Sequence, residues 1–509
     1  MRRVLILLAC LLPGMAFSEN LYQVHCASCH GADRLGGMGP ALLPENLERL
    51  KRPQAAAMIR DSRPNVQMPA FRQTLGEAQI AELVDFIYSP PVSEPAWGAA
   101  QIRGSRVVYL DAAKLPAKPQ YPADPLNLFV VVEAGDHHVT ILDGDRLEPL
   151  VRFPSRFALH GGPKFSPDGR FVYFASRDGW ISKYDLWNLK LIAEVRAGIN
   201  TRNAAVSSDG KYVLVANYLP HTLTLLDADL SLVKVFEAND KGGKSSRVSA
   251  VYDAPPRRSF IAALKDVPEL WEISYDPKSE PIANGLVHDY RLKEGDFVPG
   301  FLNPRRTELE GVLDDFFFTP DYRNVIGAQR DGKTGQVVNL DVRRAIATLE
   351  LPGLPHLGSG ISWEREGRRV MATPNLREGV VTVIDVATWK TIKHIPTLGP
   401  GFFLRSHEAS RYAWVDSMMS AKGRDTLEVI DKQTLEVAAR LTPVPGKTLA
   451  HVEFDRYGRY ALASLWEDDG ALIVYDARTL KELKRIPMKK PVGKYNVANK
   501  IGGSEGTSH

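Results

Sequence analysis

The sequence lacks any strong excess of charge. Its 64 lysines and arginines nearly balance its 60 aspartates and glutamates, which leaves a formal net charge of +4. A protein that binds nucleic acid or an acidic polymer normally displays a basic excess or a basic stripe. The near balance therefore argues against both classes of partner. The apolar content of 44% is ordinary and ample for the core of a globular protein.

Long apolar runs are also scarce, and the one that is present lies at the N-terminus. Two arginines precede an apolar core from Val4 to Leu12, and Ala16-Phe17-Ser18 provides a small-x-small cleavage site. This pattern is typical of a secretory signal, so we expect residues 1–18 to be a signal peptide and the mature protein to be periplasmic. A lipoprotein signal ending at Cys10 would have too short an apolar core. No later run is long enough to span a bilayer.

Cysteine is rare as well. Of the three cysteines, Cys10 would leave with the signal, so the mature chain keeps only Cys26 and Cys29. They stand in Cys26-Ala27-Ser28-Cys29-His30, the attachment motif of c-type haem, in which two thiols bond to the haem and the adjacent His30 becomes an axial iron ligand. A thioredoxin-like redox pair is the alternative, but it requires a preceding strand that this sequence does not show. Export fits covalent haem c, because such haems are attached outside the cytoplasm.

Residues 19–90 are expected to form a small helical cytochrome c domain. The first of its helices carries the haem motif, and the last, Ala78 to Tyr88, has its apolar side chains on one face. Between them Met68 precedes a proline, as the sixth ligand does in class I cytochromes c. A thioether opposite a histidine raises the reduction potential and suits electron transfer. Met68 is therefore the predicted second axial ligand, with Met38 and Met58 as alternatives.

Long helices are missing from the rest of the chain, which excludes an α/β domain. After a proline-rich linker and a first strand in residues 91–125, turn tags such as Pro167-Asp168-Gly169 recur, most of them at roughly forty to fifty residues. Four-stranded propeller blades have this period. Seven tags and an untagged first blade predict an all-β, eight-bladed propeller over residues 126–509. A longer gap between tags predicts an insertion at residues 277–310, a surface loop or lid.

One histidine stands in an unusual local context. His160 is followed by Gly161-Gly162-Pro163, so little bulk covers the imidazole, and the proline fixes the backbone beside it. Such a segment could present a metal ligand to a flat cofactor. A turn histidine at the edge of a blade would give the same pattern.

The order of the two domains resembles that of cytochrome cd1 nitrite reductase and its relatives. The strongest local matches are Ala158-Leu159-His160, Arg177-Asp178-Gly179, Pro355-His356 and residues 491–497. The resemblance implies that His160 is the proximal iron ligand of a haem d1 held in the centre of the propeller. Haem d1 carries several carboxylates, which arginine pairs with bidentately. Four arginines are therefore candidate cofactor contacts, the last three with a plain surface role as the alternative: Arg177, Arg156, Arg202 and Arg247.

Three departures from the nitrite reductase pattern indicate a different reaction. Leu313-Asp314-Asp315 stands where the reductase has one of its two distal histidines, and Ser359 replaces an arginine that follows the retained His356. His451 appears where the reductase has no histidine. This pattern resembles the members of the family that complete haem d1 in its biosynthesis by oxidising a propionate side chain of dihydro-haem d1 to an acrylate.

That reaction removes two electrons and two protons from a saturated carbon pair. An imidazole suits the base, so the resemblance implies His451 as catalytic base and Tyr495 as the residue that orients the propionate or relays a proton. His356 would be a distal iron ligand or gate. Electrons would leave singly through haem c to an acceptor protein. Blade-edge and core roles are the alternatives for His451 and Tyr495.

Two other functions fit parts of the sequence. A nitrite reductase is disfavoured by the aspartate at position 314. A non-catalytic haem d1 carrier would not need haem c as an exit for electrons. Nitrite reductase itself and other haem d1 maturation proteins are further candidate partners.

Overall fold

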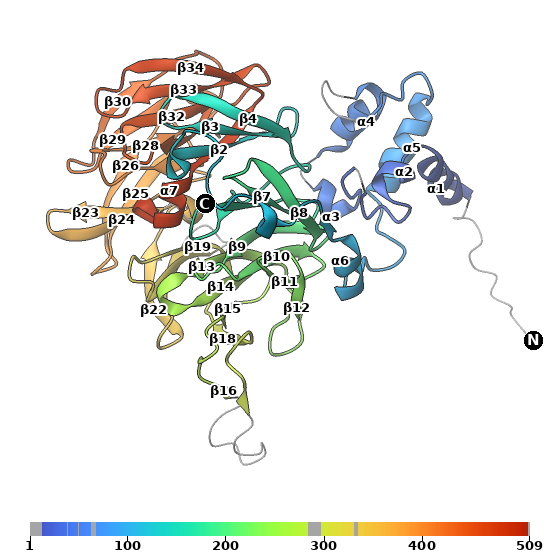
Figure 1. Ribbon diagram of the computed structural model, residues 1–509, viewed down its shortest axis with the longest axis horizontal. Helices are drawn as coiled ribbons and strands as arrows, with labels where there is room; N and C mark the ends of the chain where they lie inside the picture. Colours follow the sequence, from blue (N-terminus) through green and yellow to red (C-terminus); the bar gives the residue numbers. More distant parts are fainter. Residues whose placement is uncertain are drawn as a thin grey trace, which may run out of the picture. The chain divides into compact units, whose positions relative to one another are not determined.

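The computed structural model describes residues 13–37, 39–48, 50–62, 68–283, 297–329 and 334–506, with residues 13–17 described by their backbone alone. The chain divides into two compact units, Met1–Trp97 and Gly98–His509 (Figure 1). Most of the predicted signal peptide, including Cys10, lies outside the described residues. Within the described ranges, no helix combines the length and the apolar character needed to cross a membrane.

The first unit is helical in its described part. Its helices are α1 (Pro13–His25), α2 (Ala27–His30), α3 (Pro44–Leu47), α4 (Arg52–Asp61) and α5 (Glu77–Ile87). The predicted last helix is present as α5, which buries Ile80, Leu83, Val84 and Ile87 against Tyr22 of α1 and neighbouring apolar side chains. Each such side chain contributes about 1.5–3 kcal/mol when it is fully buried. This core holds α2, which carries the haem-attachment motif.

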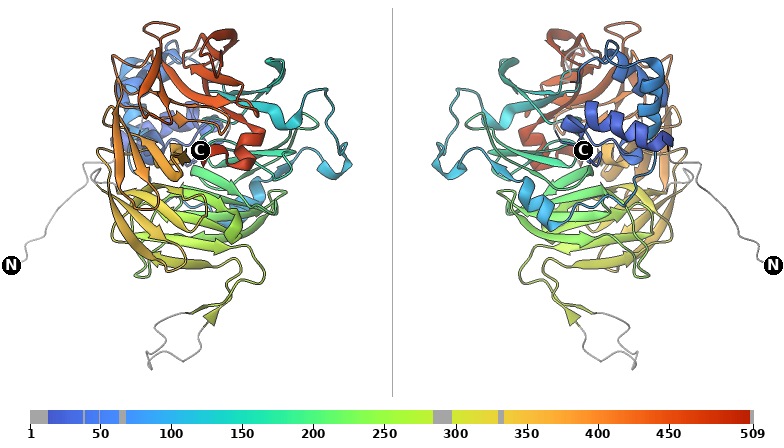
Figure 2. Two further views of the ribbon diagram at one scale, coloured as in Figure 1. Left: turned by 90° about the vertical axis from the view of Figure 1, so that its left-hand side faces the viewer. Right: turned by 90° about the vertical axis from the view of Figure 1, so that its right-hand side faces the viewer.

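The second unit confirms the predicted all-β, eight-bladed propeller: its described residues form eight sheets of at least four strands (Figures 1 and 2). Both ends of the unit build the first blade. The C-terminal strand β35 (Pro491–Asn496) pairs with β2 (Leu128–Glu133), which is followed by β3 (His138–Asp143) and β4 (Glu148–Pro154). This pairing completes the first blade with a strand from the C-terminal end of the unit, and so closes the ring.

The other blades follow in chain order. Blades two to four contain β5 (Lys164–Phe165), β6 (Phe171–Ala175), β7 (Trp180–Asp185) and β8 (Lys190–Arg196); β9 (Asn200–Val206), β10 (Tyr212–Leu219), β11 (Thr222–Asp227) and β12 (Leu232–Glu237); and β13 (Val248–Ala254), β14 (Ser259–Leu264), β15 (Glu269–Ser274) and β18 (Pro304–Glu308). Blades five and six contain β19 (Leu313–Phe318), β20 (Asn324–Gln329), β21 (Thr334–Asn339) and β22 (Arg344–Glu350); and β23 (Ile361–Arg365), β24 (Arg368–Pro374), β25 (Val380–Asp385) and β26 (Thr391–Pro396). Blades seven and eight contain β27 (Leu404–Arg405), β28 (Tyr412–Asp416), β29 (Leu427–Asp431) and β30 (Val437–Leu441); and β31 (Leu449–Phe454), β32 (Tyr460–Leu465), β33 (Gly470–Asp476) and β34 (Glu482–Met488).

Two segments add to this pattern. Residues 98–125 include helix α6 (Ala99–Ser105) and strand β1 (Val107–Val108), which pairs with β8 as a fifth strand of the second blade. The predicted insertion at residues 277–310 contains a small sheet of β16 (Ile282–Ala283) and β17 (Phe297–Val298), with residues 284–296 outside the described part. The end of that segment is not an insertion, because β18 is the last strand of the fourth blade. Its sequence, Pro-Arg-Arg-Thr-Glu, lacks the apolar alternation by which strands are recognised.

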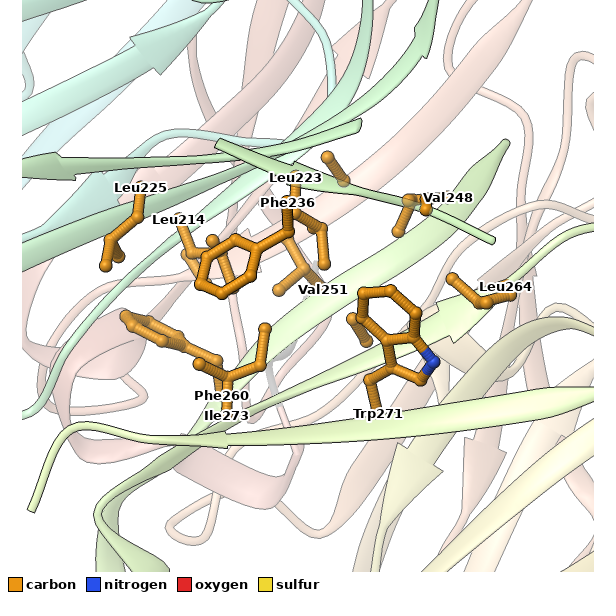
Figure 3. Packing of buried hydrophobic residues seen from close by; sticks show 14 of the residues in the cluster. Leu214, Leu223, Leu225, Phe236, Val248, Val251, Phe260, Leu264, Trp271 and Ile273 are labelled. Carbon is orange, nitrogen blue, oxygen red and sulfur yellow. The ribbon is translucent and has the colours of Figure 1, made fainter. Parts of the chain in front are cut away.

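Apolar cores lie between neighbouring blades. They fix the first strand of each blade, which is β35 in the first blade, around the centre of the ring. Figure 3 shows the core between the third and fourth blades, where Leu214, Phe236, Phe260 and Trp271 interdigitate. The last strand β30 alternates half-buried and exposed residues, whereas first strands such as β31 are buried along their length. The first strands contact one another, for example β9 with β13 and β31 with β35. Side chains on these strands therefore meet although they are far apart in the sequence.

Candidate functional site

The haem-attachment motif presents a fixed histidine beside two thiols. Helix α2 buries His30, whose Nδ1 lies 2.7 Å from the carbonyl oxygen of Pro40. Burial lowers the pKa of His30, so the ring is neutral. Donation from Nδ1 to a carbonyl leaves Nε2 as the nitrogen that can bind a metal. Cys26 and Cys29 are free, half-buried thiols within the same turn. This donor set fits a covalently attached haem.

The second axial ligand has two candidates among the described residues. Met68 is half-buried and packs against the core of the first unit, and its carbonyl accepts a hydrogen bond from the Ser62 hydroxyl at 2.5 Å. Met58 is half-buried on α4. Met38 lies outside the described residues. The proline after Met68 still distinguishes it, and Met68 remains our predicted ligand.

In the propeller, His160 lies on the loop between β4 and β5. Its Nδ1 is 2.7 Å from the carbonyl oxygen of Arg202 on β9, and its Nε2 is 2.7 Å from the guanidinium of the same arginine. Gly161 has φ +79°, and a Cβ there would lie 2.6 Å from the Cβ of Asn203. Only glycine therefore allows this close approach to β9, which sets the orientation of the imidazole.

The four predicted arginines fall into two groups. Arg156 makes a bidentate ion pair with Glu194 at 3.0 and 2.5 Å, and Arg247 makes one with Asp266 at 2.9 and 2.7 Å. Arg202 contacts the ring of His160. Arg177 adjoins the same segment through its backbone, because its N–H donates to the carbonyl of Ala158 at 3.1 Å. Arg202 and Arg177 are thus the two that lie at the His160 segment.

His356 lies before the sixth blade and is 5% exposed. Its Nδ1 is 2.6 Å from the carbonyl oxygen of Phe402, and its ring packs against the Phe402 ring with centroids 4.1 Å apart. Burial lowers the pKa of His356 to about 4, so its imidazole is neutral. Its Nδ1 is anchored in the same way as those of His30 and His160.

His451 is built differently. It is the extra residue of a β-bulge in β31, between Ala450 and Val452, and its φ of +49° is unusual for a residue with a side chain. The ring is 0% exposed, and within the described residues neither ring nitrogen has a hydrogen-bond partner. Burial, reinforced by the nearby charges of Lys494 and Arg405, lowers its pKa well below 6.5. His451 is therefore a neutral imidazole with both nitrogens unsatisfied.

Tyr495 on β35 adjoins His451, with ring centroids 5.1 Å apart in an edge-to-face contact. Residue Tyr495 as a whole is partly exposed, although its phenol lies deep enough for burial to affect its pKa. Burial raises the pKa of Tyr495 to about 12, and its hydroxyl stays protonated at neutral pH. The ring of Phe403 contacts His451 from another side at 4.6 Å. Ring contacts link five residues in series, from the loop before the sixth blade and the loop before β27 to the first strands β31 and β35: His356, Phe402, Phe403, His451 and Tyr495.

Position 314, where the resemblance places a departure, is occupied by an ion-paired aspartate. Lys265 Nζ lies 2.5 Å from a carboxylate oxygen of Asp314. The next residue, Asp315, accepts hydrogen bonds from the Tyr252 hydroxyl at 2.9 Å and from the Gly358 N–H at 3.1 Å. A carboxylate held by a lysine is a poor proton donor.

Sequence reasoning missed several buried charged residues at this centre. Arg405 on β27 and Lys494 on β35 are 0% exposed, and Asp416 at the end of β28 is 1% exposed. Buried charges are costly unless they are paired, so they mark sites with a specific role. A charged residue inside an otherwise apolar first strand is the signal that could have identified Arg405 and Lys494.

A cavity of about 1310 Å³ lies at the ends of several first strands and is lined by Lys164, Tyr252 and Lys500, among others. None of the predicted ligands or catalytic residues lines it. The cavity and the histidine-bearing starts of the strands are therefore separate features of the ring.

Comparison with known proteins places this arrangement in a family. A family model described as Cytochrome D1 heme domain matches residues 123–500. The chain belongs to the cytochrome D1 haem-domain family. Residues 16–87 match a second model, described as Cytochrome C oxidase, cbb3-type, subunit III. His160, His356, His451, Tyr495 and the four candidate arginines all fall within the part that matches the D1 model.

Two curated proteins and one solved structure resemble the chain to different extents. A protein of Pseudomonas aeruginosa named Dihydro-heme d1 dehydrogenase is 58% identical over 97% of this chain and 96% of its own length. A solved structure titled "Dihydro-heme d1 dehydrogenase NirN in complex with DHE" superposes with a TM-score of 0.89 at 58% identity and covers 95% of this chain and 100% of that one. Protein NirF of Stutzerimonas stutzeri is 28% identical over 72% of this chain and 90% of its own length.

Proposed function

We propose that this protein is a dehydrogenase of haem d1 biosynthesis that oxidises a propionate side chain of dihydro-haem d1 to an acrylate. The observation that carries the proposal is the 58% identity over 97% of the chain to a protein named Dihydro-heme d1 dehydrogenase. The enzyme is thus an oxidoreductase with haem c as its bound cofactor and the tetrapyrrole as its substrate.

In the first unit, Cys26 and Cys29 would hold haem c covalently, with His30 and Met68 as its axial ligands. This haem would accept electrons one at a time. The anchored Nδ1 of His30 supports its role, because a hydrogen-bonded Nδ1 fixes the tautomer in which Nε2 binds iron.

In the propeller, His160 would hold the substrate iron from one side and His356 from the other. The guanidinium of Arg202 now lies 2.7 Å from His160 Nε2, so it must move aside before that nitrogen can bind iron. It would then be available to a carboxylate of the tetrapyrrole, as would Arg177. Arg156 and Arg247 already satisfy protein carboxylates and would reach the substrate only by exchanging partners.

Tyr495 and His451 would handle the hydrogens that leave the propionate. The two residues differ in access: Tyr495 has accessible surface, whereas the His451 ring is wholly buried behind it and Phe403. Tyr495 is therefore the group that can touch the substrate. A protonated tyrosine can take up a proton only if it passes its own on, so His451, neutral and with unsatisfied nitrogens, would receive that proton through a hydrogen bond that forms in the substrate complex. This order keeps the two roles expected from sequence, His451 as the base and Tyr495 as the residue that orients the propionate or relays a proton.

The two electrons would leave through haem c to an acceptor protein of the periplasm, the compartment indicated by the N-terminal signal pattern and the haem motif. Other proteins of haem d1 maturation, and nitrite reductase as the user of the product, are the partners that this chemistry implies. A nitrite reductase function is disfavoured by the Lys265–Asp314 ion pair, which provides no second distal proton donor.

The test is a turnover experiment. Purified holoprotein is incubated with dihydro-haem d1 and an electron acceptor under anoxic conditions. The molecular mass of the extracted tetrapyrrole is then measured by mass spectrometry. We expect a product that has lost two hydrogens, together with transient reduction of haem c. Tight binding with no change of mass would identify a carrier instead.

A further inference from the structure

Asp416 lies where two walls of the candidate site meet. It ends strand β28, is 1% exposed, and has no ion pair within the described part of the chain. Its carboxylate accepts four backbone N–H groups instead. Oδ1 accepts from Phe402 at 2.8 Å and Met418 at 3.3 Å, and Oδ2 accepts from Phe403 at 3.0 Å and His451 at 3.4 Å. One buried side chain thus holds two segments that are distant in sequence.

The first segment positions His356. The carbonyl oxygen of Phe402, whose N–H Asp416 holds, is the group that anchors His356 Nδ1 at 2.6 Å. The ring of Phe403 lies between the two histidines, with centroids 6.3 Å from His356 and 4.6 Å from His451. A shift of the 402–403 backbone would therefore move the anchor of His356 and the wall against which His451 packs.

The second segment is the bulge at His451. A residue with a side chain keeps a φ of +49° only where its surroundings fix it. Both backbone polar groups of His451 are paired by side chains instead of a neighbouring strand. The N–H donates to Asp416, and the carbonyl accepts from Lys494 Nζ, which also donates to the Ser464 hydroxyl at 2.8 Å. Asp416 is thus one of two clamps on the bulge.

We propose that Asp416 is a positioning residue for the dehydrogenation. It fixes the position of His356 relative to the His451–Tyr495 pair. The inference rests on the proposed function. A substrate held by His356 presents its propionate to Tyr495 only if the 402–403 segment and the bulge at His451 keep fixed positions relative to each other. Small misplacements of reacting groups lower the reaction rate strongly. Asp416 acts through Phe402 and His451 and does not touch the substrate.

A purely local role is the alternative, since aspartates at strand ends commonly bind turn N–H groups. Asp385 provides the matched control. It ends β25, is 4% exposed, and accepts the N–H groups of Ala387 and Thr388, both at 2.9 Å. Its hydrogen bonds to backbone N–H groups stay within one turn, and its ion pair with Arg368 at 3.7 Å reaches only the neighbouring strand of the same blade, whereas the hydrogen bonds of Asp416 join the segments at 402–403 and 451. Asp416→Asn and Asp385→Asn are therefore equally conservative changes. We expect the first to disturb two distant segments and the second to disturb only its own surroundings.

The first measurement needs no substrate. Hydrogen–deuterium exchange of the purified holoprotein is compared over residues 399–404 and 449–453. In Asp416→Asn we expect exchange in both segments to accelerate together by about tenfold or more, because a buried amide cannot replace the carboxylate as acceptor for four donors. Asp385→Asn should leave both segments unchanged. Acceleration in only one segment, or in neither, overturns the coupling.

The second measurement uses dihydro-haem d1. We expect the absorption spectrum of the bound tetrapyrrole in Asp416→Asn to shift toward that of His356→Ala, and kcat to fall about tenfold with a smaller change in KM. A wild-type spectrum and rate overturn the proposal, as does an equal loss in Asp385→Asn. If wild-type protein binds the tetrapyrrole without converting it, the proposed function fails, while the exchange and spectral results still decide the role of Asp416.

Discussion

The four histidines that we assign to the two haem sites come in two kinds of setting. His30, His160 and His356 each place Nδ1 within 2.7 Å of a backbone carbonyl oxygen. His451 has no partner for either ring nitrogen within the described residues and sits on a strained bulge. An anchored Nδ1 fixes the tautomer and direction that a metal ligand needs. The unanchored imidazole has ring nitrogens that can receive a proton, although its burial makes the charged form costly.

The two settings also predict different effects of mutation. Removing an anchored histidine should weaken binding of a haem or tetrapyrrole, whereas changing the His451–Tyr495 pair should slow chemistry and spare binding. Four measurements can break or sharpen this division.

The largest effect is expected from Tyr495→Phe, which removes only the hydroxyl that we propose contacts the substrate. We expect kcat to fall about 10²–10⁴-fold, the usual cost of losing a proton-transfer group, with the affinity for dihydro-haem d1 retained. Single-turnover assays by mass and a binding titration measure the two quantities. Tyr475→Phe is the control, because its hydroxyl is buried in the core between blades seven and eight without a partner in the described chain. Wild-type turnover in Tyr495→Phe would show that the chemistry lies elsewhere.

Next in size is His160→Ala, on the anchored side of the comparison. We expect the affinity for the tetrapyrrole to fall about 10–100-fold, or its spectrum to change, because a proximal ligand is lost. The control is His394→Ala, on the last strand β26 of the sixth blade, which should leave binding unaltered. If His160→Ala binds with wild-type affinity and spectrum, the proximal assignment is wrong.

His451→Ala should have a smaller effect on rate, about tenfold or less and thus below the usual range for a general base. The ring has no exposed surface, and the tyrosine hydroxyl can pass its proton to another acceptor. Product formation by mass, with melting temperature recorded to detect a cavity effect, tests this. A loss as large as that of Tyr495→Phe would restore the histidine as the group in contact with the substrate.

These rankings depend on features that the sequence reveals unevenly. The helical domain and the eight blades were predictable, because amphipathic periodicity and regularly spaced turns are local signals. Strand β18 was missed, since its residues are mostly charged. The anchors of His160 and His356 join residues 42 and 46 positions apart, and the bond from His451 to Asp416 joins residues 35 positions apart, which no local pattern records. The burial of His451 behind Tyr495 likewise depends on how β31 and β35 meet.

The smallest effect expected is the absence of one. An imidazole with the ordinary pKa of 6.5 would gain a proton as the pH falls through that value, and a rate that needs the neutral form would fall with it. Burial lowers the pKa of His451 well below 6.5 and raises that of Tyr495 to about 12. The neutral forms of both residues therefore persist across the neutral pH range. A plot of kcat against pH should show no inflection near pH 6.5. The profile is measured from about pH 5.5 to 8 in the wild-type protein and in His451→Ala. A bend near 6.5 that disappears in His451→Ala would mean that water reaches the ring in the substrate complex, which would give His451 direct access to the propionate and remove the distinction between it and Tyr495.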